Sequence, residues 1–255
     1  MKNQDMFIAI RAARLAGELI LKAYGSVKNI GIKDGKGIVT EIDKQSELLI
    51  KNLLSKTGYG FLGEESETNY LTEKLWIVDP LDGTSNFVSN ISNFCVSIAL
   101  MIKGSVVLGV IYNPVEEQLF YAVRGKGAYL NEKPIHVSKN KFSINSLVLT
   151  THGYAQKDRE LYSKVVDRLV KSCMLRKLGS TALDLCRVAR GSADAFVGFG
   201  DEIWDYGAGL LIVEEAKSKV TDWNGETKRD NNYFILASSY NCNKFLKRQL
   251  KNLQY

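Results

Sequence analysis

Hydrophobic residues recur at helical spacing in two stretches near the start of the chain, and this period predicts amphipathic helices over residues 5–24 and 40–55. In the first stretch the apolar positions are Phe7, Ile8, Leu15, Leu19 and Ile20. Two arginines and a glutamate interrupt the apolar positions there, so we interpret the segment as part of the fold and not as a signal peptide. Residues 28–37, rich in Gly and Lys, are expected to form a loop between the two helices.

Short apolar runs then predict strands over residues 60–63 and 75–79, both followed or ended by acids, and a meander of strands over residues 95–131. Beyond about residue 140 strands and helices alternate. The expected strands are 146–154, 175–179, 193–199 and 232–239, and the expected helices are 158–172, 180–190, 206–215 and one at the end of the chain. A mixed first half and an alternating second half predict layered helices and sheets. We expect a single catalytic unit over residues 1–255, with approximate halves 1–140 and 141–255 and the site between them.

Composition narrows the class of protein. Apolar residues make up 45% of the chain and charged residues 24%, which is usual for a soluble globular protein. No apolar run approaches the roughly 20 residues that cross a bilayer, so we expect a cytoplasmic protein with no membrane partner. The formal charge of +6 is compatible with nucleic-acid binding. However, the basic residues are dispersed and do not alternate with aromatic residues, so nucleic acid is the weaker interpretation.

Cysteine and histidine usage restricts the kinds of metal site that are possible. The four cysteines lie far apart and form no CxxC motif, which favours buried thiols over disulfides or zinc ligands. Only two histidines are present, so a His-rich transition-metal site is not expected. Any metal would have to be bound by oxygen atoms, which favours magnesium.

Acids stand at the ends of predicted elements in four stretches. These are VTEID with Asp43, GEES with Glu64, DPLDGT with Asp79 and Asp82, and IWDYGAG with Asp205. In DPLDGT, Pro80 restricts the turn, and Gly83 leaves room for a ligand to approach the main chain. Thr84 then begins a short helix whose free N–H groups can bind an anion. Carboxylates would repel a phosphate there unless they held a metal, so the stretch favours a metal–phosphate site. The alternative is a strand followed by an ordinary turn and helix cap.

Taken together, these stretches resemble the inositol monophosphatase family of magnesium-dependent, lithium-sensitive phosphatases. The segments GEES, WIVDPLDGTSNF and IWDYGAGLLIVEEA match its three main signatures in order and spacing, VTEID matches the upstream one, and the resemblance covers essentially the whole chain. It implies an α+β or α/β fold, a layered α-β-α-β-α sandwich of the sugar-phosphatase type. The implied activity is hydrolysis of a small phosphorylated polyol or sugar, first of all inositol monophosphate, by direct in-line attack of a metal-bound water.

The resemblance also implies roles for individual residues. Glu64, Asp79 and the Leu81 carbonyl would hold one Mg²⁺, and Asp79, Asp82 and Asp205 a second, with a weaker third ion at Glu64. The main-chain N–H groups of Gly83 and Thr84 would bind the phosphate, and the Thr84 hydroxyl, paired with Asp43, would help Glu64 to activate water. Ser180 and Thr181 fall where the family lines its substrate pocket, as does Asp205. Helix capping is an equally good role for Ser180.

Two departures from the family pattern put the substrate in doubt. A glutamate that contacts inositol in the family is replaced by Gly198. Asp201 or Glu202 could reach into the site from the next loop, but we expect both to be solvated. The family's Glu-Ala-Gly-Gly is replaced by residues 215–218, EAKS, where we expect a different turn. The same chemistry on fructose 1,6-bisphosphate, histidinol phosphate or a nucleotide phosphate is the alternative. The resemblance implies that Lys33 or Lys36, in a segment that is a mobile lysine-bearing loop in the family, closes over the site. The alternative, slightly favoured for each lysine singly, is a plain surface lysine.

Two further hypotheses compete with this one. A haloacid-dehalogenase-like phosphatase carries a similar DxDGT motif, but its two aspartates are two residues apart, whereas Asp79 and Asp82 are three apart. The other hypothesis is a binding protein, because bacterial relatives also associate with the transcription and ribosome-assembly machinery. Relatives are often homodimers, so a homodimer is also expected.

Overall fold

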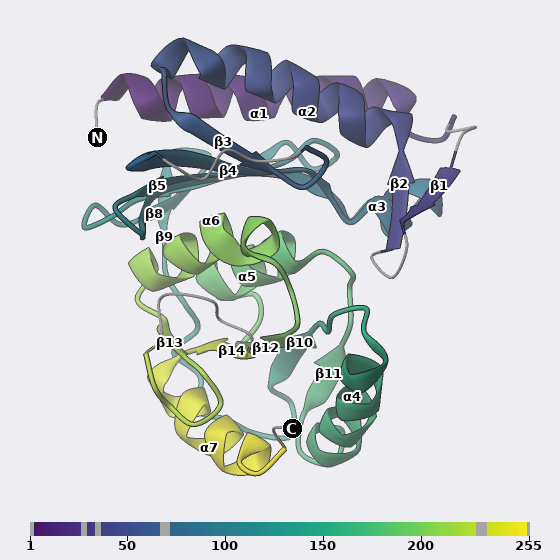
Figure 1. Ribbon diagram of the computed structural model, residues 1–255. Helices are drawn as coiled ribbons and strands as arrows, with labels where there is room; N and C mark the ends of the chain where they lie inside the picture. Colours follow the sequence, from purple (N-terminus) through teal and green to yellow (C-terminus); the bar gives the residue numbers. More distant parts are fainter. Residues whose placement is uncertain (1–2, 27–29, 34–36, 67–71, 228–233, 254–255) are drawn as a thin grey trace.

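Helices and β-sheets alternate in five layers in the computed structural model, which describes residues 3–26, 30–33, 37–66, 72–227 and 234–253 (Figure 1). One hydrophobic cluster joins both sheets to the two helices between them, and two others each join one sheet to the helices on its outer face. The α-β-α-β-α sandwich expected from the sequence is therefore confirmed.

The outer layer of the first half consists of two helices, α1 (Asn3–Ala23) and α2 (Glu41–Leu54). Their apolar faces pack against a seven-stranded sheet. The fully buried residues of α1 include four alanines, which let the helix backbone approach its neighbours closely. Thr40 caps the start of α2, and its side chain accepts a hydrogen bond from the N–H of Ile42.

The seven-stranded sheet has the order β3-β4-β5-β6-β7-β8-β9. Its strands are β3 (Gly60–Gly63), β4 (Lys74–Asp82), β5 (Cys95–Ile102), β6 (Ser105–Asn113), β7 (Gln118–Val123), β8 (Ala128–Leu130) and β9 (Lys133–Ile135). Only β3 and β4 run parallel, and the other pairs are antiparallel. A short helix, α3 (Thr84–Val88), follows β4 at the carboxyl end of the parallel pair.

The central layer consists of α5 (Thr181–Ala189) and α6 (Ile203–Glu215), which lie between the two sheets (Figure 1). Helix α6 is apolar on nearly all sides because it is covered from both directions. It also lies very close to β6. A Cβ atom built on Gly109 would be 2.6 Å from the carbonyl oxygen of Ala208, so only glycine fits there.

The second sheet has the order β11-β10-β12-β14-β13, and helices α4 (Gln156–Leu169) and α7 (Tyr240–Leu250) cover its outer face. Its strands are β10 (Leu147–Thr150), β11 (Met174–Arg176), β12 (Ala195–Phe199), β13 (Lys219–Thr221) and β14 (Phe234–Ser238). The four cysteines are all buried free thiols, as expected.

Some expectations about local structure were wrong. The segment predicted as a loop between α1 and α2 contains a hairpin, β1 (Ile30–Lys33) paired antiparallel with β2 (Gly37–Thr40). Its apolar residues are too few and too exposed for periodicity to reveal a strand. The short strands β9 and β13 were also missed.

Residues 215–218, where we expected a different turn because Lys217 replaces a glycine of the family pattern, contain a left-handed backbone conformation that glycine usually favours. Lys217 adopts it with φ of 72°, and its N–H bonds to the carbonyl of Glu214 at 2.9 Å. The helix therefore ends in this turn although Lys replaces Gly in the family pattern.

Candidate active site

The first acids of the site lie at the carboxyl end of the parallel strand pair. Glu64 follows β3 directly, and its N–H donates to the carbonyl oxygen of Val78 in β4 at 3.2 Å. Asp79 and Asp82 lie near the end of β4, where the pairing with β5 is irregular between the two aspartates. The irregularity coincides with Pro80, which cannot donate to a β ladder. The backbone therefore places Glu64, Asp79 and Asp82 at the carboxyl end of the parallel β3–β4 pair.

Asp205 reaches the same region from the other half of the chain. It lies in the first turn of α6, and its Oδ2 accepts a hydrogen bond of 2.7 Å from the N–H of Glu202. This bond anchors one carboxylate oxygen to the start of the helix and leaves Oδ1 for another partner.

Asp79 and Asp82 are oriented in a similar way. The Leu81 N–H donates to Asp79 Oδ1 at 2.9 Å. Asp82 Oδ2 accepts hydrogen bonds from the Ser180 hydroxyl at 2.6 Å and from the Ala182 N–H at 2.8 Å. Both aspartates are buried, so these bonds restrict the carboxylate orientation. In each aspartate the hydrogen bonds engage a single oxygen.

These side chains line one cavity of about 460 Å³. Glu64, Asp79, Asp82 and Asp205 all line it, together with Gly83 and Thr84. The sequence-predicted acids therefore face one space, although they come from β3, β4 and α6. Such a volume accommodates a small-molecule substrate.

Negative charges in this cavity act on one another. Burial raises the pKa of Asp79 well above its usual value, and the charges of Glu64, Asp82 and Asp205 raise it further. Burial likewise raises the pKa of Asp205, with added repulsion from neighbouring acids. For Asp82 burial raises the pKa to about 6, although the hydrogen bond from Ser180 acts in the opposite direction. Buried carboxylates that repel one another are stabilised by a bound cation.

The chemistry of these donors fits a hard divalent cation, because several carboxylates and a main-chain carbonyl oxygen are available. Within the described ranges, however, no three His, Cys, Asp or Glu side chains converge closely enough to hold a metal ion as they stand. The acids thus share a cavity without forming a closed coordination cage. Their assignment as metal ligands stays a prediction.

Asp43 and Thr84 form the pair expected from the sequence. The Thr84 hydroxyl lies 2.9 Å from Asp43 Oδ1 and 3.0 Å from the carbonyl oxygen of Leu81, so its single proton has two acceptors within reach. The other oxygen of Asp43 accepts bonds from the N–H and hydroxyl of Thr40. Burial raises the pKa of Asp43. The pair ties the start of α2 to the start of α3.

Gly83 occupies a position that no other residue fits. Its φ is 94°, and a Cβ atom there would lie 2.7 Å from the carbonyl oxygen of Asn93 and 3.3 Å from that of Gly179. Both contacts are with backbone, which cannot move aside cheaply. Glycine therefore keeps the main chain of the DPLDGT turn against the cavity.

Ser180 and Thr181 are placed differently from each other. Thr181 lines the cavity. Ser180 is buried, caps α5 by accepting from the Leu183 N–H, and donates to Asp82. Its contact with the site thus runs through Asp82. Lys36 and the side chain of Lys33 lie outside the described residues.

A family model, the inositol monophosphatase family, matches residues 1–254 of this chain. The chain belongs to the inositol monophosphatase family. It is accordingly a phosphoric monoester hydrolase, and the dehalogenase-like alternative is set aside. The family is generally metal-dependent.

Similar proteins cover nearly the same length as this phosphatase. The inositol monophosphatase of Mesembryanthemum crystallinum is 42% identical over 86% of the chain and 85% of its own length. The Nus factor SuhB of Pasteurella multocida is 40% identical over 88% of the chain and 86% of its own length. The crystal structure of the extragenic suppressor protein suhB from Bartonella henselae is 36% identical, with a TM-score of 0.91, over 97% of this chain and 98% of that one.

Several cavity residues of the phosphatase were missed by the motif argument. His152, Tyr154, Lys177 and Asp201 line the cavity from the second half of the chain. They lie outside the signatures, so no spacing pattern could reveal them. The expectation that Asp201 is solvated was wrong: its Oδ2 is buried, and burial with the nearby charge of Asp82 raises its pKa to about 8. Glu202, by contrast, is exposed, as expected.

The surroundings of Gly198 leave no room for a glutamate, the residue that the family pattern has at this position. A Cβ atom at this position would lie 2.6 Å from the Phe196 ring and 3.0 Å from the Thr151 methyl group. Aromatic and aliphatic atoms thus occupy the space into which a longer side chain would extend.

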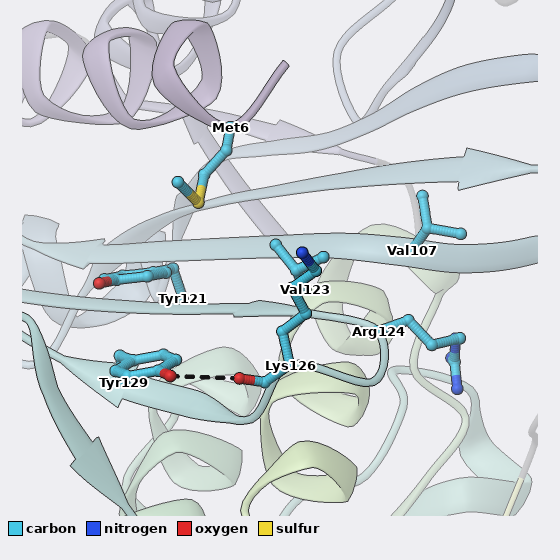
Figure 2. Close-up of a pocket in the computed structure, with 7 residues that line it drawn as sticks. All are labelled: Met6, Val107, Tyr121, Val123, Arg124, Lys126 and Tyr129. Carbon is cyan, nitrogen blue, oxygen red and sulfur yellow. Dashed lines mark hydrogen bonds between the residues drawn. The ribbon is translucent and has the colours of Figure 1, made fainter. Parts of the chain in front are cut away.

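A second cavity, of about 520 Å³, lies beside the start of α1 and shares no lining residue with the acidic one (Figure 2). Tyr121 and Tyr129 stack in it with ring centroids 5.3 Å apart, and its other described lining residues are Met6, Val107, Val123, Arg124 and Lys126. None of these described residues is an acid, so the cavity does not resemble a metal site. Across the described ranges, no helix is long and apolar enough to span a bilayer.

Proposed function

We propose that this chain is a magnesium-dependent phosphomonoesterase that hydrolyses a small phosphorylated polyol or sugar, with inositol monophosphate as the first candidate. The observation that carries the proposal is the cavity in which Glu64, Asp79, Asp82 and Asp205 face one space, where burial and the charges of neighbouring acids raise the pKa values of Asp79 and Asp205. Such repulsion is costly unless a cation relieves it.

Magnesium, in two or three ions, would be held by the residues that the family pattern implies. Glu64, Asp79 and the Leu81 carbonyl form one set, and Asp79, Asp82 and Asp205 form the other. When bound, the ions supply positive charge that activates water and stabilises the attacking and leaving oxygens. The hydrogen bonds to Asp79, Asp82 and Asp205 leave one oxygen of each for this role.

The chain's own groups position the phosphate and the attacking water. The N–H groups of Gly83 and Thr84 bind phosphate oxygens, since the first N–H groups of a helix have no acceptor within it. Glu64 accepts the proton of the attacking water, and the Thr84 hydroxyl, within hydrogen-bonding distance of Asp43, orients that water. Water attacks phosphorus directly and in line with the leaving oxygen, so no covalent phosphoenzyme forms.

Phosphate release from a panel of substrates tests this function. The panel contains inositol 1-phosphate, fructose 1,6-bisphosphate, histidinol phosphate, an adenosine bisphosphate and p-nitrophenyl phosphate, each assayed with Mg²⁺ and with a chelator. We expect release that requires Mg²⁺, is inhibited by lithium competing for the second ion, and is fastest with a polyol phosphate. Equal release in chelator would contradict the proposal.

A second role is favoured by one comparison, since relatives 36–40% identical over most of the chain bear the name Nus factor SuhB. We propose that this chain also associates with a protein of the transcription machinery, in addition to forming a homodimer. Capture of RNA polymerase subunits by an Asp82→Asn variant lacking phosphatase activity would separate this role from catalysis. Failure of both wild type and variant to capture them would contradict it.

A further inference from the structure

We propose that Asp201, with Thr181 and Lys177 beside it, recognises the hydroxyl groups of the alcohol that leaves during hydrolysis, which makes a polyhydroxylated phosphate the preferred substrate. The inference rests on the proposed phosphatase function and concerns a part of the cavity outside the family signatures. It assigns to the loop between β12 and α6 the selectivity that Gly198 cannot supply.

Asp201 has unsatisfied hydrogen-bonding capacity at the cavity wall. Its Oδ1 accepts a long hydrogen bond of 3.5 Å from the Thr181 hydroxyl. Its Oδ2 is buried and has no hydrogen-bond partner among the residues that the structure describes. A buried polar atom without a partner costs about 1–3 kcal/mol, which a ligand that bonds to it can recover. Rotation of the carboxyl group about its terminal torsion is soft, so either oxygen can turn toward a ligand.

Lys177 and His152 form a fixed polar contact on the same wall. The Lys177 ammonium lies 2.8 Å from His152 Nε2, and His152 Nδ1 lies 2.6 Å from the Gly153 carbonyl oxygen. The pattern assigns the imidazole proton to Nδ1, leaving Nε2 as the acceptor for the ammonium. Burial lowers the pKa values of both His152 and Lys177. Two of the three ammonium protons remain for other partners.

The mixture of groups discriminates between kinds of leaving alcohol. Lys177 donates, the Thr181 hydroxyl donates and accepts, and the Asp201 carboxyl, whose pKa of about 8 favours the protonated form near neutral pH, both donates and accepts. Neutral hydroxyl groups both donate and accept, so adjacent hydroxyls can use all three. An ammonium group on the substrate would be repelled by Lys177, and a second phosphate would face the carboxyl of Asp201.

The residue that the family uses for this purpose has no space here. The Phe196 ring and Thr151 methyl fill the position in front of Gly198. Asp201, three residues further on, instead lines the cavity.

The test compares two substrates in wild type and in Asp201→Ala and Asp201→Asn variants. The substrates are inositol 1-phosphate, which has adjacent hydroxyls, and p-nitrophenyl phosphate, which has none. The measured quantity is the ratio of the two kcat/KM values in saturating Mg²⁺. Asp167→Ala, an exposed aspartate on α4, is the matched control. We expect the ratio to fall roughly 10- to 100-fold in Asp201→Ala and less in Asp201→Asn, which keeps an acceptor oxygen.

An unchanged ratio in a variant that melts cooperatively would overturn the inference, as would equal losses on both substrates, which would indicate an effect on the chemistry and not on recognition. Histidinol phosphate is the third arm, and a selective loss on it alone would favour ammonium binding and overturn the inference. A wild type inactive on every phosphate would overturn the proposed function and the inference with it. Activity on p-nitrophenyl phosphate with an unchanged ratio would overturn only the inference.

Discussion

Replacing Asp82 with asparagine is expected to lower kcat roughly 1,000-fold, because the change removes a negative charge from the metal position that we propose acts on the leaving oxygen. The loss corresponds to about 4 kcal/mol of transition-state stabilisation, within the range that metal ions supply. Asparagine is nearly isosteric and keeps an acceptor for the Ser180 hydroxyl and the Ala182 N–H. Steady-state phosphate release at saturating Mg²⁺ measures the effect. Asp167→Asn is the control, since Asp167 is exposed on α4 and forms an ion pair with Lys171.

Although Asp82→Asn should lower activity, it is expected to raise the stability of the metal-free protein above about pH 6. The pKa of Asp82 is raised to about 6 in the fold, above an ordinary aspartate value of about 4. The folded state therefore binds the proton more tightly than the unfolded chain does, and metal-free wild type loses stability as the pH rises from about 4 through about 6. Asp82→Asn has no such loss. In chelator it should melt above wild type at pH 8, with the difference vanishing near pH 4.

Near-normal turnover of Asp82→Asn at saturating Mg²⁺ would show that Asp82 is not a metal ligand. A variant that loses activity and also melts well below wild type at pH 8 would show instead that Asp82 is needed for folding. The two measurements together separate these explanations.

Replacing Gly83 with alanine is expected to lower kcat/KM about 100-fold. The added methyl would lie 2.7 Å from the carbonyl oxygen of Asn93, and the φ of 94° is unfavourable for alanine. The turn must shift, which displaces the N–H groups that we propose bind the phosphate, and displacements of about 1 Å can cost 100-fold in rate. Phosphate release from inositol 1-phosphate measures the loss.

Gly58→Ala is a matched control for this change. Gly58 also has a positive φ, of 71°, but no atom lies within 4 Å of an added Cβ atom, and it follows α2 far along the chain from the DPLDGT turn. The control shares the backbone strain without the clash at the cavity. Equal losses of activity in both variants would show that backbone strain, and not the phosphate contact, explains the result.

The sequence predicted the parts of the fold whose pattern is long and regular. The helices near residues 5–24 and 40–55 and the layered architecture follow from periodicity and element order, and the structure confirms them. The pairing of Asp43 with Thr84 also appears as the signatures implied. The helices depend on the pattern of residues close in sequence. The pairing of Asp43 with Thr84 depends on signature motifs whose geometry is known from the family.

Other features depend on tertiary contacts that no local pattern records. The hairpin of β1 and β2 has too little buried apolar surface to be recognised as strands. Asp201 was expected to be solvated because it is an acid in a loop, yet one of its oxygens is buried. The filled space in front of Gly198 similarly depends on Phe196 in β12 and on Thr151, which directly follows β10.

Direct measurement of divalent-cation binding tests the central claim that Glu64, Asp79, Asp82 and Asp205 act together as a cation site. Mn²⁺, whose free form has a characteristic electron paramagnetic resonance signal, can be titrated into chelator-treated wild type, Asp82→Asn and Asp167→Asn. We predict two to three bound ions for wild type and Asp167→Asn, and at least one fewer or much weaker ion for Asp82→Asn. Equal numbers and affinities in all three proteins would contradict the account.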